Sequence, residues 1–260
     1  MDRKAFVGSL LGSVAATQAG HISAALAIDE AGIGREVFND LRNKGDILFD
    51  SPFYEHVNEI GQVLARTVKE RYQYPLRYLI VRGDSPNAFS VPGGTIYINE
   101  PLLRMARNRD ELAGVMAHEA GHMAKHHVAR LYSRAQTAGL LGSLGSILGQ
   151  ILLGPIASIG TDAALSTTQN AVFNNLSRHD EADADEEGAR IVAATNLYNP
   201  YGMIWFFDTL RKTYGEKGAF WERDHPFDSA RIADLEHLFR SEPQTFGKFA
   251  NTMQSDVAYW

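Results

Sequence analysis

The sequence contains no cysteine among its 260 residues. This absence excludes a disulfide scaffold, a zinc site built from thiolates and a cysteine nucleophile, so any bound metal must be held by histidine, aspartate or glutamate. Runs of positive charge are also missing, and 25 basic residues against 31 acidic ones give a formal charge of -6. A chain without a basic patch is not expected to bind nucleic acid.

What is present is the composition of an ordinary globular protein, with 45% hydrophobic and 22% charged residues. No internal repeat or proline-rich linker divides the chain, so residues 20–260 are expected to form one domain. Residues 1–19 combine basic residues, a mostly apolar stretch and small residues up to Ala19. This pattern resembles a secretory signal peptide, and an amphipathic helix of the mature domain is the alternative.

A small sheet is expected in the first half of the chain. Two β-rich runs, residues 78–82 and 95–99, are separated by turn-forming prolines and glycines. We expect a small antiparallel sheet around residues 87–91. With helices on both sides of it in the sequence, the fold class is α+β and mainly helical.

Hydrophobic residues at helical spacing predict the helices before and after this sheet. One long helix is expected to begin with Asn108 as its cap, with Glu111 reaching back to that cap, and to carry an apolar stripe as far as Leu131. Other helices are expected at about residues 57–68, 182–194, 201–214 and 228–239.

Residues 135–161 form a glycine-rich hydrophobic excursion without a charged side chain. The length of this segment would suffice for a transmembrane helix, but its glycines and Pro155 argue against one straight span. Two interpretations stay open. The segment is either a pair of closely packed core helices or an element that contacts a membrane surface or an assembly partner.

The chemistry of the sequence centres on His118-Glu119-Ala120-Gly121-His122, an HExxH motif inside the long helix. Histidines four residues apart lie on one helix face, so both imidazoles can bind one Zn²⁺. Glu119 projects beside them, where it can take a proton from a metal-bound water.

A hydrolytic zinc site needs a third protein ligand, and residues 177–185 provide candidates. On a helix, Glu181 and Asp185 share a face, so Glu181 could bind zinc while Asp185 accepts the outer N–H of a ligand histidine. His179 is an alternative ligand, and a solvated acidic face is the alternative for the whole segment. His126 and His127 are expected to be solvated or to lie behind the ligands.

These motifs resemble metallopeptidase family 48, a gluzincin family of zinc peptidases, and in particular its periplasmic BepA-like and LoiP-like branch. The resemblance runs in order from about Ile33 to about Leu238. The matching blocks are Gly34-Arg35-Glu36, Asn87-Ala88-Phe89 with Pro92-Gly93-Gly94, residues 109–130, Ser177-Arg178 before Glu181, and His225-Pro226 with Arg231-Ile232.

The resemblance implies a role for each residue of the motifs. It makes His118, His122 and Glu181 the zinc ligands, Glu119 the general base and acid, and Asp185 a supporting residue behind the ligands. One Zn²⁺ is therefore expected in the chain. The spacing argument agrees with this ligand set.

The resemblance also implies residues that contact the substrate. Asn87, Ala88 and Phe89 would lie as an edge strand along the cleft and pair with the substrate backbone, although an ordinary turn and strand is the alternative. His225 and Arg231 would face the zinc cleft, with Arg231 contacting substrate. His225 would either stabilise the oxyanion or take the open zinc position and keep the enzyme latent.

The expected function is that of a zinc endopeptidase that hydrolyses unfolded or misassembled proteins of the periplasm or cell envelope, with contact to a membrane surface or an assembly partner through residues 135–161. A non-cleaving chaperone or assembly factor that uses the zinc cleft to bind clients is the rival. Glu119 favours the enzyme, because a structural zinc site does not need it. An integral-membrane protease for prenylated proteins would need several membrane spans.

Overall fold

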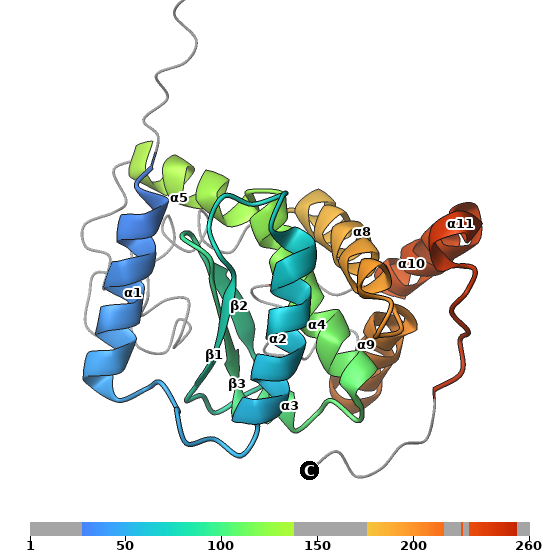
Figure 1. The fold of residues 1–260 in the computed structure, drawn as a ribbon, viewed down its shortest axis with the longest axis horizontal. Helices are drawn as coiled ribbons and strands as arrows, with labels where there is room; N and C mark the ends of the chain where they lie inside the picture. Colours follow the sequence, from blue (N-terminus) through green and yellow to red (C-terminus); the bar gives the residue numbers. More distant parts are fainter. Residues whose placement is uncertain (1–27, 138–175, 216–224, 226–228, 254–260) are drawn as a thin grey trace, which may run out of the picture.

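The computed structural model describes residues 28–137, 176–215, 225 and 229–253, and it is mainly helical with one small sheet (Figure 1). The expected α+β class is therefore confirmed. The signal-like residues 1–19 and residues 138–161 of the glycine-rich excursion lie outside the described residues. The elements are α1 (Glu30–Lys44), α2 (Tyr54–Val68), β1 (Arg77–Val81), β2 (Ala88–Val91), β3 (Thr95–Asn99), α3 (Glu100–Leu103), α4 (Arg109–Ala124), α5 (His127–Thr137), α8 (Arg178–Thr195), α9 (Tyr201–Tyr214), α10 (Ser229–Ser241) and α11 (Pro243–Phe246).

The sheet is mixed, which corrects the expected antiparallel arrangement. Its strand order is β1-β3-β2, with β2 antiparallel to β3 and β1 parallel to β3. A tight turn through Gly93 and Gly94, both with positive φ, closes the β2–β3 hairpin and makes that pair antiparallel. β1 pairs with the other edge of β3 and runs parallel to it. The sequence pattern identified the strands but not this order.

The two faces of the sheet belong to different hydrophobic clusters. Side chains alternate along β2, so that Phe89 and Val91 pack with α1 while Ala88 belongs to the cluster that includes α2 and α4. Figure 1 shows α1 on one side of the sheet and α2 and α4 on the other. The face toward α4 is the one that borders the HExxH motif.

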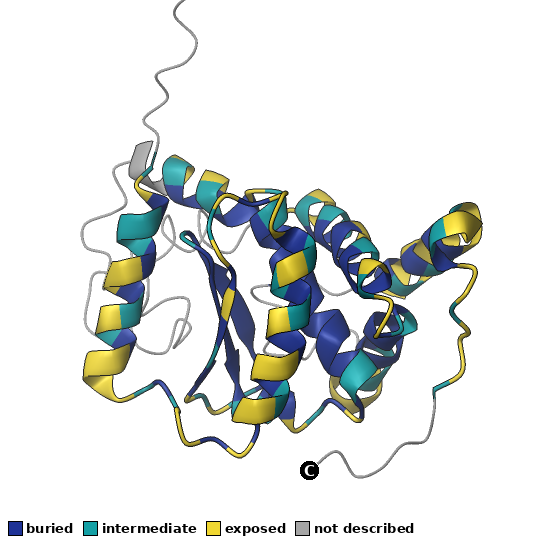
Figure 2. Cartoon of the chain, in the orientation of Figure 1, coloured by how far each residue is buried: buried dark blue, intermediate teal, exposed yellow. Residues whose placement is uncertain are grey.

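Helix α4 is buried along almost its whole length, with every residue from Glu111 to Met123 buried (Figure 2). Glycine permits this packing. A side chain at Gly121 would lie 2.6 Å from the Ala184 carbonyl oxygen, and one at Gly188 would lie 2.9 Å from the Ala117 carbonyl oxygen. The backbones of α4 and α8 therefore touch at the motif, which brings the residues of α8 to those of α4.

The predicted long helix is in fact two helices, α4 and α5, which corrects the expected continuation to Leu131. The break is at His126, whose φ is 55°, and Leu131 lies on α5. The expected cap is half right. The Asn108 side chain accepts from Glu111 N at 2.9 Å, but the Glu111 carboxylate accepts from the backbone N–H of Arg107, whose side chain it also binds.

The expected helices in the last third are present as α8, α9 and α10. In the part of the chain that the structure describes, no helix is both long enough and apolar enough to cross a bilayer.

Candidate metal centre

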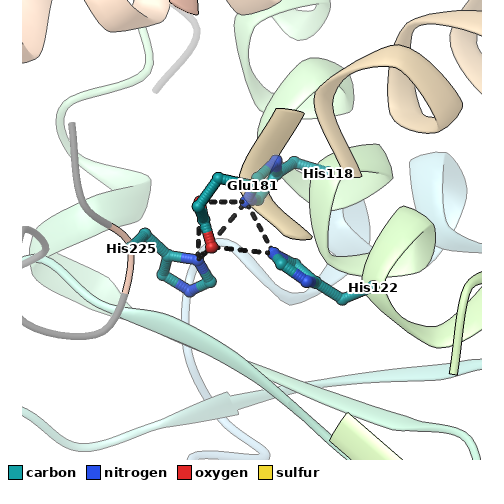
Figure 3. A group of neighbouring side chains, drawn as sticks. All are labelled: His118, His122, Glu181 and His225. Atoms are coloured by element: carbon teal, nitrogen blue, oxygen red, sulfur yellow. Dashed lines mark hydrogen bonds and ion pairs between the residues drawn. The ribbon is translucent and has the colours of Figure 1, made fainter. Parts of the chain in front are cut away.

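Four buried side chains meet at one point: His118, His122, Glu181 and His225 (Figure 3). Each has a nitrogen or oxygen atom within 4.8 Å of the corresponding atoms of the other three. They come from three parts of the chain, since α4 carries the first two, α8 carries Glu181, and His225 lies before α10. The structure thus brings together the three residues that the sequence predicted as ligands, with His225 beside them.

Local sequence places Glu181 at the start of α8. The Ser177 side chain accepts from Asp180 N at 3.1 Å, and the Asp180 side chain accepts from Ser177 N at 3.0 Å. This capping box fixes the first turn of the helix, from which Glu181 points toward α4. His179, the alternative ligand, is exposed and is not a member of the cluster.

The spacing of the ligand atoms fits a zinc ion. His118 Nε2 lies 3.1 Å from His122 Nε2 and 3.4 Å from Glu181 Oε2, and His122 Nε2 lies 3.3 Å from Glu181 Oε1. Nitrogen and oxygen ligands about 2.0–2.1 Å from a tetrahedral ion are separated by about 3.3–3.4 Å. The three side chains therefore need little movement to bind one ion.

Charge in the site also fits a divalent cation. The carboxylates of Glu119, Glu181 and Asp185 are buried, and among the described residues Arg231 is the guanidinium that pairs with Glu181 and Asp185. When the histidines are neutral, as metal binding requires, three carboxylates and one guanidinium leave two negative charges in an environment where unpaired charge is costly. A divalent ion balances that charge.

His118 is held by charged partners. Its Nδ1 donates to Asp185 Oδ1 at 2.8 Å, which directs Nε2 toward the ligand cluster. Arg231 in turn donates to both oxygens of Asp185 at 2.7 Å and lies 3.0 Å from Glu181 Oε2. Asp185 thus contacts the nitrogen of His118 that points away from the cluster, and its role as support of a metal ligand stays a prediction.

Arg231 faces inward to these two carboxylates and stacks on the Phe207 ring, with 4.5 Å from the guanidinium carbon to the ring centre. The structure thus places it in the support of the site. Contact between Arg231 and substrate stays a prediction.

His122 is held by a neutral partner. Its Nδ1 lies 2.9 Å from Nδ1 of the buried His127. If His122 binds metal through Nε2, its Nδ1 carries the proton and donates to His127. The Nε2 of His127 then carries a proton that faces Asp180 and Asp183, at 3.6 and 3.9 Å. His127 therefore lies behind a ligand, which was one of the two expectations, whereas His126 is exposed.

The pKa values of the two ligand histidines are shifted in opposite directions. Burial alone would lower the pKa of His118, but the hydrogen bonds and charges of Asp185 and Glu181 outweigh it and raise this pKa to about 9. Burial lowers the pKa of His122, and the charge and hydrogen bond of Glu181 offset this lowering only in part. The pKa of His127 is lowered to about 4, also by burial.

The pKa values of the two carboxyl groups that balance these histidines are lowered. Burial would raise the pKa of Glu181, but the charges of His225, Arg231 and His122 hold it well below its usual range. The pKa of Asp185 is likewise lowered against the effect of burial, chiefly by the charge and hydrogen bonds of Arg231. Both groups therefore remain available as carboxylates at neutral pH.

Glu119 lies beside the cluster and is fully buried. Its Oε2 accepts a hydrogen bond from Ser90 Oγ at 3.1 Å. Its Oε1 makes no hydrogen bond to the described residues and lies 3.3 Å from His225 Nε2. Ser90 thus holds one oxygen of Glu119, and the other oxygen lies beside His225 at the edge of the four-residue cluster.

His225 contacts both functional carboxylates. Its Nδ1 lies 3.1 Å from Glu181 Oε1, and its other nitrogen faces Glu119. Burial opposes its charged form, but the negative charges of Glu181 and Glu119 raise its pKa. This placement suits a fourth ligand, which would hold the enzyme latent, and a donor to a developing oxyanion, so both predicted roles stay open.

Ala88 and Phe89 are the first residues of β2, an outer strand of the sheet, and Asn87 directly precedes the strand. Asn87 N donates to Asn99 Oδ1 at 2.9 Å, and the Phe89 ring stacks on Tyr97. These contacts fix the strand against β3. Pairing of this strand with a substrate backbone stays a prediction.

Sequence reasoning did not single out Ser90. The signal was present in the alternation of β2, because Ser90 shares its face with Ala88, and a hydroxyl on an apolar inward face needs a partner. The position of His127 could not be predicted in the same way, because it depends on the break in the helix at His126.

Comparison with known proteins agrees with this geometry. Residues 54–239 match the model of peptidase family M48. The chain is 27% identical over 217 residues to a beta-barrel assembly-enhancing protease of Yersinia pestis, which covers 81% of this chain and 44% of that protein. It is 23% identical over 190 residues to metalloprotease LoiP of Escherichia coli, covering 72% and 70% of the two chains.

A mitochondrial metalloendopeptidase of Schizosaccharomyces pombe is 25% identical over 184 residues, covering 68% of this chain and 51% of that protein. The match to the beta-barrel assembly-enhancing proteases spans less than half of their length. The family model spans most of this chain and includes the whole HExxH helix, Glu181 and Arg231. The chain therefore belongs to peptidase family M48.

Proposed function

We propose that this protein is a zinc-dependent endopeptidase that hydrolyses peptide bonds of unfolded or misassembled proteins at the bacterial cell envelope. One observation carries the proposal: a buried glutamate, Glu119, lies beside a cluster of two histidines and one glutamate with the atom spacing of a zinc site. Membership of peptidase family M48 supports the same activity.

The residues of the chain divide the reaction between them. When bound, zinc would supply Lewis acidity for the scissile carbonyl and lower the pKa of water at the site. His118, His122 and Glu181 would hold it. Glu119 Oε1, the oxygen without a hydrogen bond to the described residues, takes the proton of the attacking water and passes it to the departing amine. The role proposed for His225, whose Nε2 lies 3.3 Å from that oxygen, is to donate to the oxyanion.

The substrate and location are inferred from relatives. One relative is named as a protease that enhances β-barrel assembly, and another as metalloprotease LoiP. We infer a location in the periplasm or cell envelope and substrates that are unfolded or misassembled proteins there. Residues 135–161 are proposed to contact the membrane surface or an assembly partner. An extended substrate would pair with Asn87–Phe89 on β2.

The test is hydrolysis of casein by zinc-loaded wild type and by the Glu119→Gln variant, with the zinc content of both measured. The proposal expects cleavage by wild type and the loss of at least about a hundredfold in the variant, because general acid–base catalysis contributes about 10²–10⁴. The variant should keep its zinc. A wild type and a His225→Ala variant that both hold zinc and cut nothing would instead support the rival function, a chaperone or assembly factor.

A further inference from the structure

Ser90 is a polar residue on an otherwise apolar face. It lies opposite Ile96 in the β2–β3 pair, and its neighbours on this face, Ala88 and Ile98, belong to the cluster that packs against α2 and α4. Ser90 is 6% exposed. A buried hydroxyl of this kind requires a hydrogen-bond partner. The partner is Glu119 Oε2, at 3.1 Å.

The hydrogen bond acts on a side chain whose last torsion is soft. The carboxylate of a glutamate rotates easily about its terminal bond, because that torsion has broad and roughly two-fold preferences. The Ser90 hydroxyl holds Oε2, and this leaves Oε1 directed toward His225. Burial by itself would not fix the plane of the carboxylate, and so would not direct one of its two equivalent oxygens toward His225.

We propose that Ser90 is a positioning residue for Glu119, so that the strand expected to bind the extended substrate also fixes the orientation of the general base. The hydroxyl comes from the residue that directly follows Asn87–Phe89 on β2. A peptide paired with β2 and the proton acceptor Oε1 are therefore placed by the same strand. This inference rests on the proposed peptidase function.

The chain contains a matched control in Ser51. The Ser51 hydroxyl also is buried and also donates to a glutamate, Glu100 Oε1, at 2.8 Å. That pair joins the segment before α2 to α3, and neither residue belongs to the metal centre. Ser51→Ala therefore removes the same kind of hydrogen bond without changing the general base.

The experiment measures kcat, KM and zinc content for wild type, Ser90→Ala and Ser51→Ala on one peptide substrate. The proposal expects kcat of Ser90→Ala to fall about tenfold to a hundredfold, because a misplaced catalytic group costs up to about 10² in rate. KM should stay within about twofold and zinc should stay at wild-type content, because the lost interaction acts in the transition state. Ser51→Ala should keep the wild-type kcat.

Two results overturn the proposal. One is an active wild type beside a Ser90→Ala variant with equal or higher kcat, and the other is an equal loss of kcat in Ser90→Ala and Ser51→Ala. A wild type that keeps zinc and cuts nothing, even when His225 is replaced by alanine, contradicts the proposed function itself, and the role of Ser90 falls with it. Comparison with wild type therefore separates the two failures.

Discussion

The two histidines of the HExxH motif lie one turn apart on the same helix, yet the tertiary structure supports them in different ways. On one side, His118 donates to Asp185, which accepts hydrogen bonds from two nitrogens of the Arg231 guanidinium. On the other side, His122 contacts a neutral imidazole, that of His127. Sequence spacing makes the two ligands equivalent. Only the elements packed behind them, α8 and α10 for His118 and α5 for His122, make them different.

The difference shows two ways in which the cost of burying polar groups beside the histidines is offset. The charged side carries carboxylates that would be costly in the interior without Arg231. On the neutral side, the partner behind His122 is the uncharged imidazole of His127. This partner costs less to bury than a carboxylate, and it also orients His122 less strongly. We therefore expect the two sides to respond unequally to substitution.

The largest effect is expected from replacing Arg231, the cation that pairs with Asp185 and Glu181 on the charged side of the site. Replacing this residue by leucine leaves Asp185 and Glu181 buried without their cation, which should lower the free energy of unfolding by about 3–5 kcal/mol. Urea unfolding of the zinc-loaded protein measures the change. The control is Arg190→Leu, which removes a partly exposed pair with Glu242 and should cost at most about 1 kcal/mol. Equal losses in the two variants would contradict the assigned importance of the charged side.

A smaller effect is expected from Asp185→Asn. The asparagine oxygen can still accept from His118, but the negative charge that strengthens this hydrogen bond is lost. Zinc affinity should fall about 10- to 100-fold, as for other partners of metal-bound histidines. Competition with a chelator measures it. Glu186→Gln, a change on the same helix at an exposed residue, should leave the affinity unchanged.

The neutral side should contribute less to zinc affinity. His127→Leu removes an uncharged hydrogen bond to His122, worth about 1 kcal/mol, so affinity should fall about fivefold to tenfold. The same chelator competition applies. His126→Asn is the matched control, because His126 is the exposed neighbour and its positive φ suits asparagine. A greater loss of zinc affinity in His127→Leu than in Asp185→Asn would contradict the expectation that the charged partner of His118 contributes more than the neutral partner of His122.

The smallest expected effect is the release of a proton on zinc binding, which distinguishes His118 from His122. The pKa of His118 is raised to about 9, so without metal this side chain is protonated near neutral pH, whereas His122, with its lowered pKa, is not. Zinc binding at about pH 7.5 should therefore release at least one proton, which comes from His118. Calorimetry in two buffers with different ionisation enthalpies counts it, and Asp185→Asn should release less. Heats that do not depend on the buffer would contradict this assignment.

The same shift predicts how the stability of the metal-free protein depends on pH. The folded pKa of His118 is above its unfolded value of 6.5, so the protonated group contributes stability that is fully present below pH 6.5. This contribution is lost as the pH rises through about 9. Urea unfolding at a series of pH values should show the decrease, and a zinc-saturated sample, in which His118 is not free to titrate, should not.

Much of the metal centre could be predicted from the sequence. The spacing of His118 and His122 places both on one helix face, and the spacing of Glu181 and Asp185 gives a ligand and its support on another helix. These relations are local, since they depend only on the 3.6-residue period of a helix. The structure brings these four residues together as the pattern indicated.

The fold was predicted less completely. The strands were identified from their β-rich composition, but the order β1-β3-β2 was missed because strand order depends on where β3 inserts. The break at His126 was missed because the apolar stripe continues across it into α5. In both cases packing between distant segments outweighed a local pattern.

The sequence by itself determined the chemistry of this protein, because ligand type and helical spacing follow from residue identity and backbone geometry. Only the tertiary structure decided the environment of each ligand. It placed Arg231 against Asp185 and Glu181, His127 behind His122, and Ser90 on Glu119. These contacts join residues on different elements, most of them far apart in the chain, and they are selected because buried charges and hydroxyls must find partners once the core excludes water.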